Sequence, residues 1–485
     1  MRENQGRYRK VFKVLTDIVY YQMTDNKHLI NKSLYNTFME LGGVYIKFLQ
    51  HLSLNNKFFA GWGEHLPRVA FEQVKPTPLD INSFILSELG GDGKSKFLEI
   101  ESKPFAAGSF AQVYKAKLID GKTVVIKVLR PGLMKNLKAD LSLIKTFSKI
   151  IKLFASDMML DIDSVFEQFE KTTLEETNYI KELRNAQWFF NYYNNNEHVI
   201  IPNVYPELST QSIITQEFID GVSLAHIINM HIENKQNINE FVRTTLNSDL
   251  NTQLKIIGVE LMHGSLFADI VQGDPHPGNL RLLKNNKIAF LDFGIIAKTP
   301  KDGQAFYDLI DAYRGYYNGN FDIKNYTKCI MRFIAEDLYF AIQQINEELN
   351  GDDLIEKIGL AATKFLGVDF EDDSSVNYKN KQQSISKLFS TVINEGNRFG
   401  IHMKPESLNL MKSAQIYMNV LNTIDPDVNL MSDVLNITMA KAQQQQQYLK
   451  SAKQKQFTTG EALTVVSAWL AEIAQKDPKL FKLLN

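Results

Sequence analysis

The sequence predicts an α+β fold in two lobes for a chain of 485 residues. Short runs typical of strands lie at 104–116, 123–128 and 212–217. The last of them runs into a glycine turn at Asp220-Gly221, which is typical of a hinge between lobes. Apolar residues at helical spacing precede, interrupt and follow these strands, so helices and strands are expected in separate regions.

The first part of the chain is expected to form a helical extension followed by the small lobe. Residues 1–100 are expected to be helical and to end in a loop region containing Pro76–Pro78 and Gly90-Gly91. Residues 101–218 are assigned to the small lobe. Apolar residues repeat at helical spacing between about 132 and 175, which predicts a helical insert in this lobe.

The large lobe and a helical tail complete the chain. Residues 219–430 are assigned to the large lobe and residues 431–485 to the tail. The apolar run at 462–474 is shorter than the roughly 20 residues of a membrane span and contains a glutamate, so it predicts a helix docked on the large lobe. The polar run Gln443–Gln447 is read as a solvated helix, with disorder as the alternative.

Composition excludes several classes of site. The net charge of −1 without a large basic face argues against general nucleic-acid binding. Cys329 is the only cysteine, which excludes an internal disulfide and a cysteine-based zinc site. No secretory signal and no transmembrane span are recognised, so we expect a cytoplasmic protein.

The N-terminal segment is basic and amphipathic. It can lie peripherally on the inner, anionic face of the cell membrane, or it can pack as a helix on the protein core. The cations are Arg7, Arg9, Lys10 and Lys13, and the apolar residues at helical spacing are Val11, Phe12, Leu15, Ile18 and Val19.

Asp274-Pro-His-Pro-Gly-Asn279, followed thirteen residues later by Asp292-Phe-Gly, is the most informative pattern in the chain. Phosphoryl transfer needs a carboxylate beside the acceptor and hard oxygen ligands for magnesium. Asp274 fits the acceptor-side role, whereas Asn279 and Asp292 fit the metal. Asp-Phe-Gly alone is a common tight turn after a strand, here 287–291, but the paired spacing favours a protein-kinase-like site.

The upstream half of such a site is present in the expected order. A turn of small residues at 106–111 lies between two strands, and the strand after Asp120-Gly121 carries Lys127. Small residues let the backbone approach phosphates, although alanine resists positive φ, so a stiff loop is predicted. Lys127 is the candidate partner of nucleotide phosphates, and the alternative for a lone strand lysine is a solvated edge.

The lysine needs a carboxylate partner, for which Glu176 and Glu182 are the candidates, and we favour Glu182. The hinge-like strand would turn its backbone towards the adenine. The residues predicted to line the nucleotide are Ala106, Ala107, Gly108, Ser109, Phe110, Ala111, Val113, Lys127, Glu217, Phe218 and Ile219.

These motifs together resemble the UbiB/AarF family of atypical kinases. Members show Ala-Ala-Ala-Ser-Ile-Gly-Gln-Val where this chain has 106–113, and His-Ala-Asp-Pro-His-Pro-Gly-Asn where it has 272–279. Their Glu-Leu-Asp-Tyr-x-x-Glu-Ala-x-Asn helix is similar to 176–185. The N-terminal Lys-x-Gly-Gln motif, which in the family folds over the active site, is similar to 47–50, so Lys47, Gln50 and Glu176 are candidate regulatory residues.

The chain also departs from the family pattern. Gly108 stands where the family has its third alanine, and Ala111 stands where it has its one glycine. Leu49 replaces the glycine of the N-terminal motif, and Asn178 replaces an acidic residue, so a partner for Lys47 has to be sought mainly at Glu176.

The resemblance implies an enzyme that uses ATP and Mg²⁺ and supports ubiquinone or related isoprenoid-lipid metabolism. Its implied partners are a nucleotide, an isoprenoid lipid or membrane surface, and proteins of lipid biosynthesis. Two alternatives stay open: a catalytically weak nucleotide-binding regulator or scaffold, and a small-molecule phosphotransferase, which shares the catalytic-loop pattern.

Overall fold

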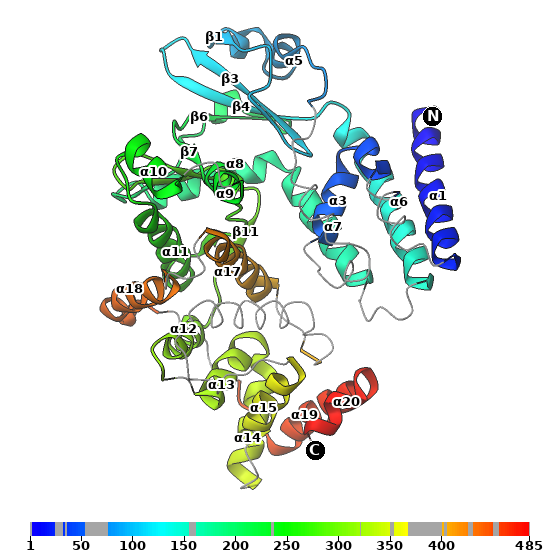
Figure 1. The fold of residues 1–485 in the computed structure, drawn as a ribbon, viewed down its shortest axis with the longest axis vertical. Coiled ribbons are helices and arrows are strands. Elements are labelled where there is room, and N and C mark those ends of the chain that lie inside the picture. Colours follow the sequence, from blue (N-terminus) through cyan, green and yellow to red (C-terminus); the bar gives the residue numbers. More distant parts are fainter. Residues whose placement is uncertain are drawn as a thin grey trace. The chain divides into compact units, whose positions relative to one another are not determined.

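The structure is a computed structural model of the chain. It describes residues 2–24, 33, 36–53, 76–154, 162–233, 237–320, 322–349, 354–366, 400–401, 405–424, 430–449 and 455–484. The chain divides into two compact units (Figure 1). Unit 1 comprises Met1–Tyr192 and Pro202–Phe218, and unit 2 comprises Tyr193–Ile201 and Ile219–Asn485.

An antiparallel sheet forms one part of unit 1. Its strands lie in the order β1 (Phe97–Ile100), β3 (Ala111–Leu118), β4 (Thr123–Leu129) and β6 (Ile213–Glu217), and β2 (Ala106–Ala107) pairs with β3. The strand, turn and return strand predicted from the sequence are therefore confirmed, as is the strand that precedes the hinge-like turn.

The two faces of this sheet differ because side chains alternate along β3 and β4. Tyr114 of β3 and Ile126 of β4 are buried on one face, in an apolar cluster with α5 (Ile81–Lys94). Val113 and Lys127 are register partners on these strands, so they share the opposite face.

Helix α5 corrects the prediction of a loop through Gly90-Gly91. Asp80 caps the helix by accepting hydrogen bonds from two backbone N–H groups of its first turn. Ile81 and Ile85 then face the sheet one turn apart and are fully buried. The chain kinks at Gly90, whose φ of 70° glycine adopts without strain, and the helical segment continues to Lys94.

Besides α5, the described α-helices of unit 1 are α1 (Arg2–Met23), α3 (Val44–Ser53), α6 (Leu133–Phe154), α7 (Ile162–Glu176) and α8 (Tyr179–Tyr192). The first four pack against one another (Figure 1). The helical spacing predicted between about 132 and 175 corresponds to α6 and α7.

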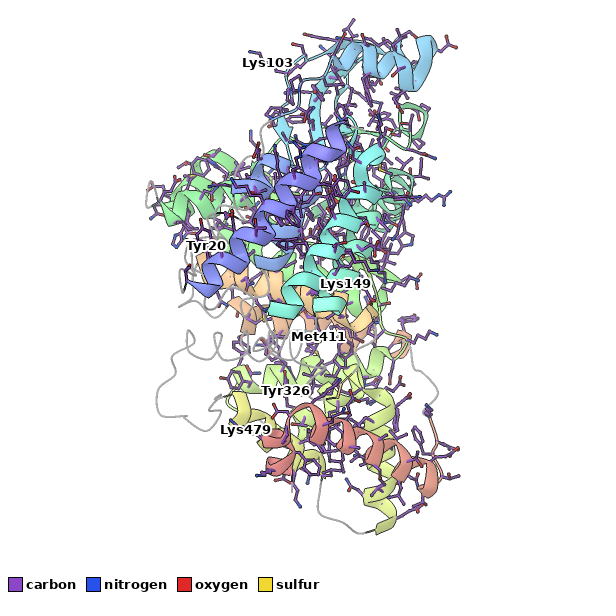
Figure 2. The ribbon with its side chains drawn as sticks, turned by 90° about the vertical axis from the view of Figure 1, so that its right-hand side faces the viewer. Tyr20, Lys103, Lys149, Tyr326, Met411 and Lys479 are labelled. Atoms are coloured by element: carbon purple, nitrogen blue, oxygen red, sulfur yellow. The ribbon has the colours of Figure 1, made fainter. Side chains whose placement is uncertain are left out.

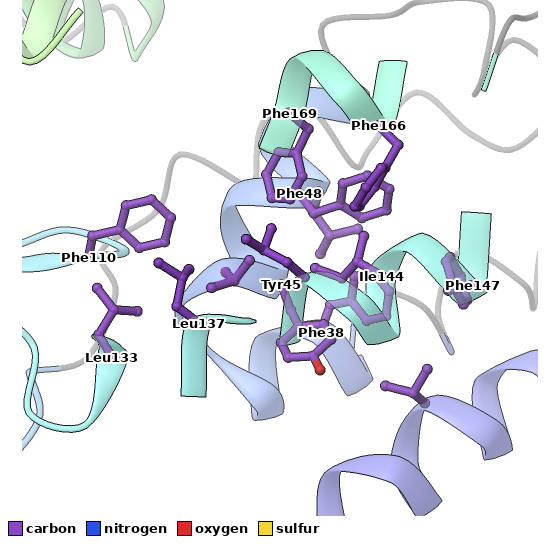
Figure 3. Close-up of a cluster of buried hydrophobic side chains, with 14 of the residues drawn as sticks. Phe38, Tyr45, Phe48, Phe110, Leu133, Leu137, Ile144, Phe147, Phe166 and Phe169 are labelled. Carbon is purple, nitrogen blue, oxygen red and sulfur yellow. The ribbon is translucent and has the colours of Figure 1, made fainter. Parts of the chain in front are cut away.

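A core of aliphatic and aromatic side chains holds these helices together (Figure 3). Phe38 packs edge-on to Tyr45 with ring centroids 5.5 Å apart, and Phe48 of α3 meets Phe169 of α7 at 4.9 Å. Val11 of α1 belongs to the same buried cluster. Val11, Val14 and Leu15 of the N-terminal helix therefore pack on the protein core, as the second of the two alternatives predicts, whereas Phe12 is exposed.

Unit 2 contains two small sheets. The first has the strand order β5 (Val199–Ile200), β10 (Ile288–Phe290), β9 (Leu280–Leu282) and β7 (Val222–Ser223). Strand β10 confirms the run predicted to precede Asp292.

The second sheet pairs β8 (Ile270–Gln272) with β11 (Ile296–Lys298), and the short 3₁₀ helix η2 (Pro277–Asn279) follows β8. These elements hold the segment from Gln272 to Asn279 between strands of both sheets.

Helices make up most of unit 2. The helix predicted at 462–474 is confirmed: α19 begins with a capping box made by Thr458 and Glu461 and packs on α14 around Trp469. The polar run Gln443–Gln447 is exposed and ends α18. In chain order the described α-helices are α9 (Leu224–Ile232), α10 (Ile238–Leu246), α11 (Leu250–Phe267), α12 (Gly303–Tyr317), α13 (Ile323–Ile334), α14 (Glu336–Leu349), α15 (Leu354–Leu366), α17 (Pro405–Ile424), α18 (Leu430–Gln444), α19 (Thr459–Lys476) and α20 (Pro478–Leu484).

Candidate active site

Lys127 of β4 forms a bidentate ion pair with Glu182 of α8. The lysine Nζ lies 2.7 Å from Oε1 and 3.0 Å from Oε2 of the carboxylate. The side chain of Glu182 is 4% exposed and that of Lys127 is 20% exposed. The ring centroid of Tyr179, one turn before Glu182, lies 5.2 Å from the same Nζ. The lysine–glutamate pair that the sequence favoured is present, and it holds a flexible ammonium group at a defined place on the sheet.

A second lysine–glutamate pair uses a glutamate that is close in sequence to Glu182. Lys47 of α3 places its Nζ 2.8 Å from Oε1 of Glu176, the last residue of α7. Both side chains are mostly buried, so this contact fastens α3 to α7. Gln50 continues α3, and its side chain lies outside the described part of the structure.

The loop of small residues between β2 and β3 is a closed turn. The backbone N–H of Gly108 donates to the carbonyl oxygen of Ala111 at 2.8 Å, and Ala106 pairs with Val113 across the strands. None of the residues 106–111, all of which the structure describes, has positive φ. Alanine at 111 is therefore accommodated without backbone strain.

Arg130, the residue after β4, fixes this turn. Its backbone N–H donates to the carbonyl of Phe110 at 2.8 Å, and its Nε donates to the carbonyl of Gly108 at 2.9 Å. Its Nη1 also donates to the hydroxyl of Thr77 at 2.8 Å. The ring of Phe110 is buried in the helical core, which leaves its backbone, rather than its side chain, at the turn. Sequence reasoning missed Arg130, because a single arginine beyond a strand carries no pattern.

The predicted hinge residues follow β6. The ring of Phe218 lies edge-on to Phe105, the residue before β2, with centroids 6.0 Å apart, and Lys115 Nζ lies 4.3 Å above the Phe218 ring. The backbone N–H of Asn203 donates to the carboxylate of Glu217 at 3.2 Å. Ile219 is the first residue of the second segment of unit 2.

In unit 2, hydrogen bonds join the three residues predicted for catalysis and metal binding into one local structure. The side-chain amide of Asn279 donates to the carbonyl oxygen of Asp274 at 3.5 Å. The carbonyl of Asn279 accepts a hydrogen bond at 3.0 Å from the N–H of Leu291, the residue before Asp292. This hydrogen bond brings Asn279 beside Asp292. The carboxylate of Asp292 accepts from the N–H of Gly294 at 3.0 Å, which orients it after β10.

Gln272, the last residue of β8, connects the same residues through a buried side chain. Its amide nitrogen donates to the carbonyl oxygen of Asp292, and its amide oxygen accepts from the backbone N–H of Asp274 at 3.4 Å. Its own carbonyl accepts from the hydroxyl of Ser413 on α17 at 2.8 Å. Sequence reasoning included this position only as the first residue of the segment aligned with a family motif and assigned it no role.

Comparison with known proteins identifies the family. The model of the ABC1 atypical kinase-like domain matches residues 71–314, about half of the chain. The chain belongs to the ABC1 (UbiB/AarF) family. The matched range includes Lys127, Glu182, Asp274, Asn279 and Asp292, whereas Lys47 lies before it.

Relatives of this ABC1-family chain differ in how much they share with it. An uncharacterized protein in the hydrogenase 1 5′ region of Clostridium pasteurianum is 27% identical over 92% of this chain and 78% of its own length. The chloroplastic Activity of BC1 Complex Kinase 3 of Arabidopsis thaliana is 29% identical, over 55% of this chain and only 36% of its own length. Among solved structures, the complex of Rv3197 with erythromycin from Mycobacterium tuberculosis is 21% identical, with a TM-score of 0.44, over 86% of this chain and 98% of that one.

The donor set of this ABC1-family chain fits magnesium. The amide nitrogen of Asn279 is engaged with the Asp274 carbonyl, so its amide oxygen is the atom left to face a cation. Asp292 adds a carboxylate, and a neutral oxygen with a carboxylate is a set that Mg²⁺ accepts, with phosphate and water completing its shell. No cluster of three or more histidine, cysteine or carboxylate side chains suited to a metal occurs among the described residues.

Proposed function

We propose that this chain binds Mg-ATP and transfers the γ-phosphoryl group to water or to an acceptor. Lys127, oriented by Glu182, would contact the nucleotide phosphates, and the turn at 106–111 would cover them. Asp274 would orient the acceptor hydroxyl and take its proton, whereas Asn279 and Asp292 would hold the metal. A bound magnesium ion would neutralise charge on the phosphate oxygens.

The observation that carries this proposal is the Lys127–Glu182 pair. In kinase-like folds, a lysine on a strand of the small-lobe sheet binds the nucleotide phosphates when a carboxylate from a helix orients it. Here a nearly buried glutamate meets the lysine through both oxygens, from a helix 55 residues further along the chain. An edge-strand lysine that merely faces water would not be held in this way.

The test uses purified protein and the Asp292→Asn variant. We expect the wild type to release phosphate from ATP in a magnesium-dependent way, and the Asp292→Asn variant to lose this activity. We also expect ADP or ATP to raise the melting temperature of the wild type, and a change at Lys127 to reduce that rise. Nucleotide binding with no turnover under any metal condition would overturn phosphoryl transfer and favour the second candidate below. No nucleotide binding at all would overturn both.

A nucleotide-binding regulator is the second candidate, and the closed turn at 106–111 favours it. The N–H of Gly108 is already satisfied by Ala111, and Arg130 holds the carbonyls on either side of Ser109. A turn constrained in this way presents fewer backbone donors to phosphates than an open glycine loop. Nucleotide would then act as a conformational ligand rather than as a substrate.

The role in ubiquinone or isoprenoid-lipid metabolism rests on family resemblance alone. Among the described helices, none combines the length and the apolar character that crossing a membrane requires. Contact with a lipid surface would therefore have to come from side chains exposed on the described elements or from residues beyond them.

A further inference from the structure

Arg281 is a cationic side chain on an interior strand, β9, of the first sheet of unit 2. Its neighbours along the strand, Leu280 and Leu282, are 1% and 0% exposed, and Arg281 itself is partly buried. Cationic side chains usually lie in water, as do three lysines labelled in Figure 2: Lys103, Lys149 and Lys479.

The guanidinium of Arg281 is incompletely satisfied by the residues that the structure describes. Its Nη1 donates to the carbonyl oxygen of Gly221 at 3.2 Å, whereas its buried Nε meets no described hydrogen-bond acceptor. Burial lowers the pKa of Arg281, and the charge of Asp220 opposes that shift without a hydrogen-bonded ion pair. A desolvated cation with one neutral acceptor is costly, so folding alone gives no reason for an arginine here.

Gly221 holds the guanidinium at the end of the predicted hinge. A Cβ added at Gly221 would clash with Cδ2 of Leu283 and lie 2.8 Å from the carbonyl oxygen of Leu282, so glycine is needed for this close approach to β9. The carbonyl that accepts from Arg281 is therefore fixed by packing. Gly221 follows by two residues Ile219, the last residue predicted to line the base.

Arg281 also lies on the same side of β9 as the proposed metal ligand Asn279. The N–H of Leu291 donates to the carbonyl of Asn279, which continues the β9–β10 ladder one residue beyond the strand. Asn279 and Arg281 are thus alternate positions, and alternate residues of a strand face the same side. A nucleotide extends from its metal-bound phosphates through the ribose to the base, so a side chain between Asn279 and Gly221 is placed to meet the nucleoside.

The neighbouring strands carry short side chains beside Arg281. Ser223 of β7 and Ala289 of β10 are its register partners, so the three side chains share one face of the sheet. Arg281 is therefore the large side chain that a flat ligand on this face would meet. A guanidinium is planar and weakly hydrated, and it stacks on aromatic rings in a way that a lysine ammonium does not.

We propose that Arg281 stacks the plane of its guanidinium on the base of the bound nucleotide, so that affinity depends on the size of the base. The inference rests on the proposed binding of Mg-ATP. A purine offers a larger π face than a pyrimidine, so Arg281 should contribute more to the binding of adenine nucleotides than of uracil nucleotides. Phosphate is the poorer partner, because Nη1 is already engaged with the Gly221 carbonyl near the hinge.

The experiment is calorimetric titration of the full chain in excess magnesium with ADP and UDP, with pyrophosphate measured by competition. Arg281→Leu should weaken ADP binding about tenfold, the usual loss when one stacking partner of a base is removed, and UDP binding only about threefold. Pyrophosphate binding should stay unchanged. Arg281→Lys should weaken ADP binding nearly as much as the leucine variant, because lysine keeps the charge but lacks the plane.

Arg243→Leu is the matched control. Arg243 of α10 lies in the same unit, its side chain is 74% exposed, and it pairs with Glu240 at 3.6 Å. Its replacement should leave all three affinities unchanged. Arg281→Leu should keep or exceed the wild-type melting temperature, because it removes a desolvated charge, and this readout separates a ligand contact from a structural role.

Full ADP affinity in Arg281→Leu or in Arg281→Lys would overturn the stacking contact. Equal loss of ADP and pyrophosphate binding would overturn it by assigning Arg281 to the phosphates. A lower melting temperature with the same weakening of every ligand would assign it a structural role instead. A wild type that binds no nucleotide would overturn the proposed function itself, whereas a wild type and an Arg281→Leu variant that bind ADP equally would overturn only this inference.

Discussion

Glu182 accepts two hydrogen bonds from the ammonium group of Lys127, at 2.7 and 3.0 Å, while its own side chain is only 4% exposed. A carboxylate so far from water depends on its partner, because removing one member of a buried pair leaves the other charge uncompensated. A change at one member of the pair should therefore destabilise unit 1.

Glu182→Gln should lower both nucleotide affinity and stability. Glutamine keeps the shape of the side chain but loses the charge, so Lys127 is held less firmly. We expect the free energy of unfolding to fall by about 1–3 kcal/mol, the usual cost of an unsatisfied charged hydrogen bond. The first quantity is measured by isothermal titration with Mg-ADP and the second by urea unfolding.

Glu175→Gln provides the comparison for that change. Glu175 pairs with Lys181 at 3.1 Å in the same region, but its side chain is 30% exposed and that of Lys181 is 37% exposed. An exposed pair of this kind contributes at most about 1 kcal/mol. If the two variants were equally impaired, the special role given to Glu182 would be wrong.

Asp274→Asn should separate chemistry from binding. The amide fits in place of the carboxylate but does not take a proton, and removal of a positioned base typically costs 10²- to 10⁴-fold in turnover. Single-turnover phosphate release should fall by that order, while the thermal shift with Mg-ATP stays near the wild-type value. Full turnover in this variant would remove Asp274 from the mechanism.

Gln272→Leu should reduce turnover through geometry. The leucine side chain fills similar space but loses the donor to the Asp292 carbonyl and the acceptor for the Asp274 N–H. We expect stability to fall by about 1–3 kcal/mol and turnover by up to about 10²-fold, because small displacements of catalytic groups are costly.

Gln272→His distinguishes positioning from simple loss of stability. Histidine can donate and accept when neutral but only donate when protonated, so its protonation would remove the acceptor for Asp274. Turnover of this variant should fall below about pH 6.5, the ordinary histidine pKa, to a greater extent than that of the wild type. Identical pH profiles would show that the position does not orient the catalytic loop.

Much of the site could be predicted because its parts are local in sequence. The strand before Asp292, the turn before β3 and the lysine of β4 each follow from short patterns, and their order indicated the remaining partner, Glu182. The contacts of Arg130 and Gln272 could not be predicted, because each is made by one polar side chain to backbone carbonyls that no pattern marks. The error at Gly90-Gly91 has a related cause: the cap at Asp80 and the packing of Ile85 outweighed two glycines.

Arg130→Lys should loosen the turn at 106–111 without disturbing β4. Lysine keeps the charge but lacks the planar fork that reaches both Gly108 and Thr77. We expect faster hydrogen exchange at residues 106–111. Nucleotide affinity should change several-fold: it should fall if the closed turn is the form that binds nucleotide, and rise if the turn has to open. Unchanged exchange at the turn would show that these contacts do not restrain it.

Lys412 of α17 should make stability depend on alkaline pH. Desolvation lowers the pKa of this lysine to about 8, against 10.5 for the unburied group. Between these values the unfolded chain binds more protons than the folded one, so the free energy of unfolding rises with pH. The rise should approach about 3 kcal/mol from pH 8 to pH 10.5 and should be absent in Lys412→Met, when both proteins are unfolded in urea at matched pH values. Parallel curves for the two proteins would show that Lys412 contacts solvent or a counter-charge in the folded chain. In that case the contribution of α17 to the segment around Asp274 would rest on Ser413, whose hydroxyl donates to the carbonyl of Gln272.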